Sequence, residues 1–226
     1  MYKEKTDREL IELLETHKKL TFQAQLNLQQ EFNQRNLSKN INDLENTIEN
    51  KKSGIENLEY LKDIGFEVEK NGNSLKVTRT LKATVMDIIA SILGILLCII
   101  GLFGIIGLIG SFFSENEFSL FGLVVELGMV GLGILGVKFL NGIKRLIDYS
   151  GFELLNTNGT IILKKRFDMK LVEIQKNSSL LELEKQADRL IFRLEKDEIF
   201  NGNAKNIVQN MTLNELNRKL KVANTV

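Results

Sequence analysis

The stretch VMDIIASILGILLCIIGLFGIIGLIGSFF (85–113), followed by SENE (114–117) and FSLFGLVVELGMVGLGILGVKFL (118–140), decides the architecture of this chain. No charged residue occurs between Ile88 and Phe113, and Glu126 is the only one between Phe118 and Val137. About 20 apolar residues in a helix are enough to cross a hydrocarbon core of roughly 30 Å. The sequence therefore predicts transmembrane helices over 85–114 and 118–140, joined by an external turn at 115–117.

Composition excludes several classes of function. The formal net charge of the 226 residues is +1, which implies no attraction to nucleic acid. The single cysteine, Cys98, cannot form an intrachain disulfide or a multi-cysteine zinc site. The sequence contains no nucleotide-binding, metalloprotease or serine-hydrolase motif, and one histidine does not make a plausible triad. We therefore expect no enzyme activity, no cofactor and no metal.

The N-terminal residues 1–64 are predicted to form a cytosolic helical segment. The start is charged and has no apolar core of a signal peptide, so we expect the first apolar run to act as the insertion signal. Apolar residues then recur at alternating spacings of three and four, typical of a coiled-coil seam: Leu37, Ile41, Leu44, Ile48, Ile55 and Leu58. A helix break near 33–40, with Ser38 as a second N-cap, leaves two arrangements open. One long helix would oligomerise through the seam, and two shorter helices would fold back on each other.

Two similar β-hairpins are predicted on either side of the apolar stretch, at 65–82 and 151–167. Each begins with Gly-Phe-Glu, and each has an Asn-Gly near its middle that accepts the positive φ of a tight turn. Two strands alone are marginally stable in water, whereas four are stable. We therefore expect the hairpins to pair into one small cytosolic sheet.

The C-terminal residues 168–226 are predicted to form a cytosolic helical or mixed segment. Apolar residues between Leu180 and Leu194 fit one helical face, although LLELE and RLIFRL also fit two strands. We favour the helix because the intervening KQAD contains no Gly, Asn or Pro. A short final helix is expected from Met211, capped by Thr212 with Glu215 at capping-box spacing.

The distribution of basic residues predicts the topology. Lys76, Arg79 and Lys82 precede the first span, whereas the turn between the spans carries only negative charge. Lys138, Lys144 and Arg145 follow the end of the second span. The positive-inside rule then places both termini in the cytoplasm. We expect the two spans to lie in the inner (cytoplasmic) membrane of the cell.

Glu126 is the most informative residue of the apolar stretch, because a charge near the bilayer centre costs roughly 2.5–3.5 kcal/mol. It shares one helical face with small or flexible residues that let another helix approach: Gly122, Met129, Gly133 and Gly136. Three hypotheses follow. The carboxyl of Glu126 hydrogen-bonds to a neighbouring helix, or it lines an ion or proton path. In the third hypothesis it has no role and is tolerated because the residue tilts toward the membrane–water interface.

Charged residues at the cytosolic end of the spans have simpler interpretations. Arg79, Lys82, Lys144 and Arg145 are candidates for the membrane surface, where they would meet anionic lipid. Asp87 is interpreted as an interfacial residue, or else as a partner of Lys82 or Lys138.

The sequence thus predicts a membrane α+β protein: a two-helix transmembrane hairpin, a coiled-coil-like N-terminal segment, a small cytosolic sheet and a helical or mixed C-terminal segment. Its expected function is a membrane anchor or scaffold that forms homo-oligomers and binds a cytosolic protein partner. The alternative is a small oligomeric pore with Glu126 in its protein-facing interior. A membrane enzyme has the least support.

Overall fold

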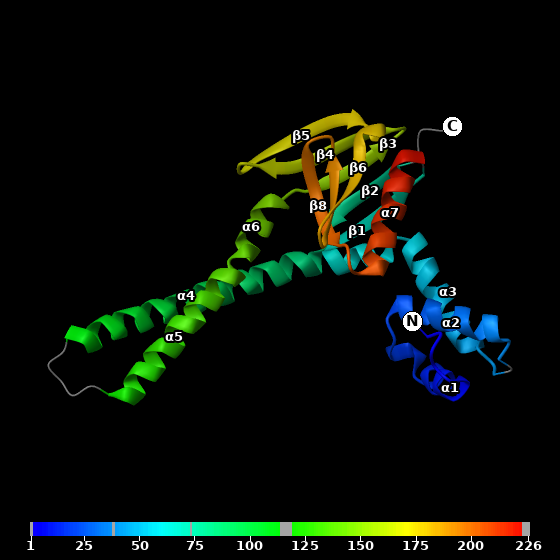
Figure 1. The fold of residues 1–226 in the computed structure, drawn as a ribbon. Coiled ribbons are helices and arrows are strands. Elements are labelled where there is room, and N and C mark those ends of the chain that lie inside the picture. Colours follow the sequence, from blue (N-terminus) through cyan, green and yellow to red (C-terminus); the bar gives the residue numbers. More distant parts are fainter. Residues whose placement is uncertain (1, 38, 73, 114–118, 223–226) are drawn as a thin grey trace. The chain divides into compact units, whose positions relative to one another are not determined.

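The computed structural model describes residues 2–37, 39–72, 74–113 and 119–222 of the chain (Figure 1). Helices and antiparallel sheets are mixed, so the class is α+β. The chain divides into two compact units. One comprises Met1–Val77, Leu155–Ile161 and Gln175–Val226, and the other comprises Thr78–Leu154 and Ile162–Ile174.

The N-terminal segment is several short helices, not one long one. These are α1 (Asp7–Glu15), the 3₁₀ turn η1 (His17–Lys19), α2 (Phe22–Arg35), α3 (Asn42–Glu56) and the 3₁₀ turn η2 (Glu59–Ile64). Thr6 caps α1 and forms a capping box with Glu9, and these hydrogen bonds lower the pKa of Glu9 to about 2. Asn36, in the left-handed conformation with φ 50°, ends α2. The Ser38 expected to cap the next helix lies outside the described residues.

The seam residues of this segment are buried or partly buried within their own chain. Leu44 and Ile48 of α3 lie in one apolar core with Leu28 and Phe32 of α2. The single long helix is therefore wrong, and the break between 35 and 42 lets α2 and α3 pack on each other. Lys51 interrupts the seam and donates to Gln25 Oε1 at 2.8 Å, and its burial lowers its pKa.

The first sheet contains both predicted hairpins. Its strands are β1 (Phe66–Asn71), β2 (Ser74–Arg79), β3 (Glu153–Thr157), β4 (Thr160–Phe167) and β5 (Lys170–Asn177), in the order β1-β2-β3-β4-β5. Gly72 at φ 57° and Gly159 at φ 82° supply the positive φ of the two Asn-Gly turns. Because β2 neighbours β3, the segment between them is an insertion into one sheet.

The predicted helix over 178–200 is wrong. A 3₁₀ turn η3 (Ser178–Leu180) leads into β6 (Leu181–Gln186), β7 (Arg189–Leu194) and β8 (Asp197–Asn203), which form a separate antiparallel sheet. Ala187 adopts φ 49°, so the tight turn forms although KQAD contains no glycine or asparagine. Phe192 and Phe200 stack with ring centroids 5.3 Å apart in the core of this sheet.

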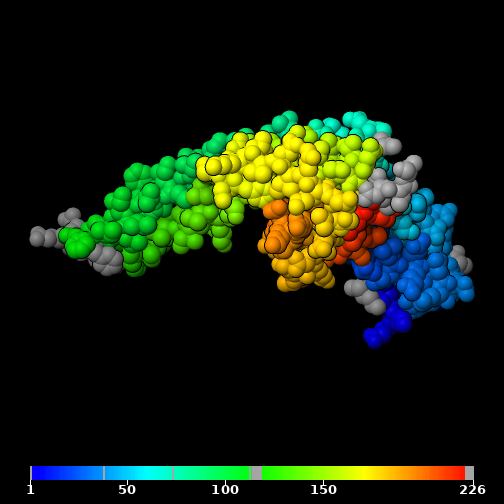
Figure 2. Space-filling view, turned by 90° about the horizontal axis from the view of Figure 1, so that it is seen from above, coloured from blue at the N-terminus to red at the C-terminus, as the bar shows by residue number. Residues whose placement is uncertain are grey.

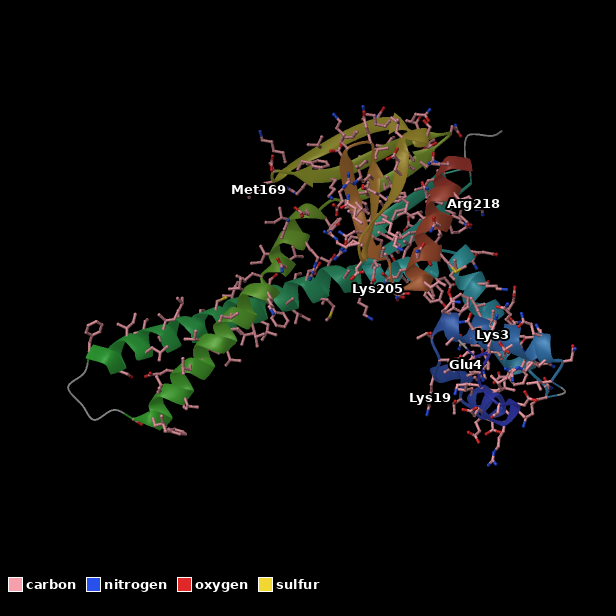
Figure 3. The ribbon with its side chains drawn as sticks, in the orientation of Figure 1. Lys3, Glu4, Lys19, Met169, Lys205 and Arg218 are labelled. Carbon is pink, nitrogen blue, oxygen red and sulfur yellow. The ribbon has the colours of Figure 1, made fainter. Side chains whose placement is uncertain are left out.

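The final helix α7 (Ile207–Val222) begins earlier than predicted. Asn206 Oδ1 accepts from the backbone N–H groups of Val208 and Gln209, whereas Thr212 lies inside the helix and donates to Val208 O at 2.8 Å. Leu213, Leu216 and Leu220 are buried along one face of α7. Arg218, on another face, is labelled in Figure 3.

The insertion in the sheet consists of three helices: α4 (Leu81–Phe113), α5 (Leu120–Phe139) and α6 (Asn141–Asp148). The predicted turn at 115–117 lies outside the described residues. α4 and α5 lie side by side (Figures 1 and 2), and the glycines of α4 that come close to the second helix lie between Gly94 and Gly107. Two stretches, Leu81–Ser111 and Leu120–Asp148, are long and apolar enough to cross a membrane.

Candidate functional site

A buried carboxylate joins three elements at one end of the apolar helices. Asp87, in the second turn of α4, is 4% exposed. Its Oδ2 accepts from Arg79 Nη2 at 2.6 Å, and its Oδ1 accepts from Arg145 Nε at 2.7 Å. Arg79 is the last residue of β2, and Arg145 lies on α6. The cluster therefore ties the strand before the insertion to both ends of the apolar hairpin.

Local sequence explains why these groups meet. The Thr80 hydroxyl accepts from Ala83 N at 3.1 Å, so α4 starts at Leu81, two residues after Arg79. Ser91 donates to Asp87 O at 2.7 Å, and Gly142 lies so close that an added Cβ would be 2.7 Å from the same carbonyl. A glycine at 142 thus permits the approach of α6 to α4.

A pocket of about 380 Å³ opens beside this cluster. It is lined by residues of β2, α4, α6 and the loop that follows α6: Thr78, Arg79, Thr84, Asp87, Arg145, Leu146, Tyr149, Ser150, Gly151 and Phe152. Arg79 lies over the Tyr149 ring, with Cζ 4.9 Å from the centroid, and Lys165 Nζ lies 5.2 Å from the same centroid. Two guanidinium groups face one carboxylate, so the lining carries an excess of positive charge.

Glu126 pairs within its own hairpin. Ser111 Oγ of α4 lies 2.9 Å from Oε1 and 3.1 Å from Oε2 of Glu126. Gly107 leaves room for this pair, because a Cβ there would be 2.9 Å from Glu126 Oε1. The partner hydroxyl favours the hypothesis that the carboxyl serves helix packing.

Most of the predicted face of α5 contacts α4. A Cβ added at Gly133 would lie 2.7 Å from Gly101 Cα, and one added at Gly136 would lie 2.8 Å from Cys98 N. Met129 Cβ is 2.7 Å from where Gly104 would carry a Cβ. Gly122 differs, since only Ser119 of its own helix end is within 4 Å of an added Cβ.

The stripe of α4 that meets this face was not predicted in full. It runs at spacings of four and three through Asp87, Ser91, Gly94, Cys98 and Gly101. The interpretation of Asp87 as a partner of Lys82 or Lys138 is wrong, because its carboxylate pairs with Arg79 and Arg145. The missed signal is that Asp87 begins this regular stripe of small residues, and so faces α6, which follows α5.

The four predicted membrane-surface cations separate into two pairs. Arg79 and Arg145 converge on Asp87, whereas Lys82 and Lys144 are exposed and have no ion pair in the described part of the chain. Among the described residues, no group of three or more His, Cys, Asp and Glu side chains is arranged to hold a metal ion.

A second hollow, here called the helical groove, lies in the unit that contains the N-terminal helices. It has a volume of about 730 Å³ and lies between the start of α2 and the start of α7. Its lining is rich in amide side chains: Gln23, Asn203, Asn206 and Asn210, with Phe22 beneath them. Amides donate and accept hydrogen bonds, which suits a polypeptide backbone.

Comparison of the chain with known protein families, curated proteins and solved structures finds no match. The function is therefore inferred from the chemistry of the chain alone.

Proposed function

We propose that this protein is an integral membrane anchor that holds an α+β domain at the cytosolic surface of the cell's inner membrane and serves as a scaffold. The observation that carries the proposal is the apolar surface of α4 and α5. Large apolar side chains are exposed along both helices, for example Ile92, Leu96, Phe103, Ile106, Val124, Leu127, Ile134 and Val137. Soluble proteins rarely expose an apolar patch larger than a few hundred Å².

The core helices of soluble proteins and signal sequences are also apolar, but neither accounts for α4 and α5 as well as a membrane span does. The core helix of a soluble protein would be mostly buried, whereas only 17% and 6% of the most apolar windows of these helices are buried. A signal sequence lies near the N-terminus, whereas α4 begins at Leu81, after a folded helical segment. A lipid bilayer is the environment that covers such a surface without a partner protein.

The orientation follows from charge and connectivity. Basic residues flank the apolar helices at the ends joined to β2 and α6, which favours the cytosolic side for these ends. A two-helix hairpin returns the chain to the side from which it entered, which agrees with strands β2 and β3 being neighbours.

Membrane fractionation tests the anchor. The full chain should stay in the membrane pellet after an alkaline carbonate wash and should enter the supernatant only with detergent. A variant with lysines at Leu96 and Ile134, two exposed apolar positions, should lose most membrane retention because each lysine costs about 3 kcal/mol at the centre of a span. Release of the unaltered chain by carbonate would contradict the proposal.

For the scaffold role, we propose that a cytosolic polypeptide binds in the helical groove. A photoreactive amino acid at Gln23, within the groove, should give a discrete cross-linked product in cells. The same amino acid at Glu49, on the exposed surface of α3, is the matched control. Equal cross-linking patterns at the two positions would argue against binding in the groove.

The alternative function, an oligomeric pore, has less support. The coiled-coil seam, the glycine face and Glu126, which favoured it, are engaged within a single chain. A homo-oligomer remains a proposal and would use the outer faces of α4 and α5. Purified protein in vesicles should cause no ion leakage, and leakage that Glu126→Gln abolishes would favour the pore.

A further inference from the structure

We propose that the pocket beside Asp87 binds the phosphate group of an anionic phospholipid from the cytosolic leaflet. This inference rests on the membrane anchor proposed above and assigns a ligand to its cytosolic end. The residues that carry it are Arg145, Arg79 and Tyr149, which line the pocket with Asp87.

Arg145 supplies the hydrogen-bond donors. A guanidinium group has five N–H donors, and Arg145 uses only its Nε–H, on Asp87 Oδ1. The terminal nitrogens of Arg145 have no acceptor within the described residues, and its side chain is 50% exposed. Two parallel N–H groups on a guanidinium match the oxygens of a phosphate. Asp87 thus fixes the guanidinium by one edge and leaves the other edge for an anion.

The charge of the pocket favours an anion. Asp87 is fully engaged by two arginines, so the cluster retains one positive charge in excess. Lys165 is not one of the lining residues, but its Nζ lies 5.2 Å from the centroid of the Tyr149 ring that lines the pocket. Lys165 is 9% exposed, and its interactions with the rings of Tyr149 and Phe167 orient it within the same unit. A cation or a neutral peptide would gain less from this lining.

The position of the pocket favours a lipid over a free phosphate. Asp87 directly precedes the uncharged run that begins at Ile88, and Arg145 lies on α6, two residues after Ile143 and shortly after the end of α5. In the proposed anchor this is the depth of the lipid headgroups. Leu146 and Phe152 give the pocket an apolar side suited to the glycerol and first methylenes of a lipid.

The test uses the full chain purified in an uncharged detergent, with bound lipid counted by native mass spectrometry. The probes are phosphatidylglycerol, phosphatidylcholine, inorganic phosphate and glycerol 3-phosphate. Arg145→Gln removes the donors. Arg145→Lys keeps the positive charge and a partner for Asp87 but removes the two parallel N–H donors of the guanidinium. Weaker binding in this variant therefore reports loss of the donors and not loss of folding. Lys144→Gln, one residue away on α6 and outside the pocket, is the matched control.

We expect one phosphatidylglycerol to bind more tightly than phosphatidylcholine, and both Arg145 variants to bind it at least about tenfold more weakly. Lys144→Gln should stay within about threefold of the unaltered chain. Equal affinities of the Arg145 and Lys144 variants for phosphatidylglycerol would overturn the proposal. Binding would then depend on the overall positive charge of this surface and not on a specific site. Displacement of the lipid by equimolar inorganic phosphate or glycerol 3-phosphate would overturn the assignment to a lipid.

Carbonate fractionation of the same variants distinguishes this proposal from the anchor. Variants that stay in the membrane pellet but show no lipid selectivity refute the lipid site alone. Loss of the unaltered chain from the pellet refutes the anchor itself.

Discussion

Asp87 is the residue on which the base of the apolar hairpin depends. Its carboxylate is buried and receives one hydrogen bond from each of two arginines that are far apart in the sequence. Burial of a charge is costly unless the charge is paired and hydrogen-bonded. Both conditions are met here, so removal of the carboxylate leaves Arg79, whose side chain is only 12% exposed, without this partner.

We expect Asp87→Ala to lower the stability of the chain by about 3 kcal/mol, since it removes the carboxylate from a buried, hydrogen-bonded ion pair. For a chain of this size the loss corresponds to a fall in Tm of about 6–12 °C. Thermal unfolding in detergent measures it. Asp148→Ala, at the end of α6 and without an ion pair in the described part of the chain, should have little effect. Equal shifts for the two variants would show that Asp87 has no special role.

Met169 occupies a strained position at the turn between β4 and β5 (Figure 3). Its φ is 67° and its side chain is exposed, so it bears the steric cost of the left-handed region without burial in return. Met169→Gly should therefore raise the stability by about 1 kcal/mol, seen as a Tm higher by about 2–4 °C. A lower Tm would mean that the methionine side chain makes a stabilising contact.

The helical face on which a residue lies was easier to predict from the sequence than the residue that it contacts. Glu126 was expected on a packing face, and it pairs with Ser111 there. The ion-pair partners of Asp87 were misassigned because a carboxylate at the edge of an apolar run has the same appearance whichever cation it pairs with. One of its two partners, Arg145, lies 58 residues further along the chain, and no local pattern relates two such positions.

Among the elements, α4 and α5 approach closely because glycines face each other. A Cβ added at Gly101 would lie against the Cα of Gly133, whereas one added at Gly110 would meet nothing within 4 Å. Gly101→Ala should therefore destabilise the hairpin by about 1–3 kcal/mol through overpacking. Gly110→Ala should be neutral or stabilising by up to about 1 kcal/mol, because alanine favours a helix. Equal Tm values for the two variants would refute the close contact.

The ion pairs of α7 predict a pH dependence. The hydrogen bond from Arg218, together with the charges of Arg218 and Lys219, lowers the pKa of Glu215 in the folded chain. A carboxyl with a lowered pKa stabilises the fold fully above its unfolded value, and this contribution disappears as the pH falls through the folded value. We therefore expect stability to decline below the ordinary pKa of 4.5.

Urea unfolding at a series of pH values measures this effect. In Glu215→Gln the part of the decline that belongs to this group should vanish. Glu182→Gln, which replaces an exposed glutamate on β6 without an ion pair in the described residues, should keep the full decline. An unchanged profile in Glu215→Gln would contradict the assignment.

The sequence predicted helices and strands well where the spacing of apolar residues fitted only one kind of element. The apolar helices and the Asn-Gly hairpins lie where their patterns indicated. Residues 181–194 fit both the helical and the strand period. The absence of Gly, Asn and Pro from KQAD led to the wrong choice, because Ala187 tolerates φ 49° once β6 and β7 pair. The start of α7 was missed because Asn206 caps it ahead of the apolar repeat.

For the whole molecule, our main proposal is that α4 and α5 form a membrane hairpin inserted between two neighbouring strands of one sheet. Length and hydropathy alone predict two spans, and the sheet order explains how the chain resumes β3 beside β2. The sequence repeat between the two hairpins suggested this arrangement, because it matched residues on both sides of the apolar stretch.

Accessibility of single cysteines to a membrane-impermeant thiol reagent is the decisive test of the membrane hairpin. In a Cys98→Ala background, Asn116→Cys reports on the segment between the spans, and Lys185→Cys, exposed on β6, reports on the domain. If both spans cross the membrane, the reagent added to intact cells labels the cysteine at 116 and not that at 185, and inverted membrane vesicles give the opposite pattern. Labelling of both cysteines from the same side would contradict the hairpin.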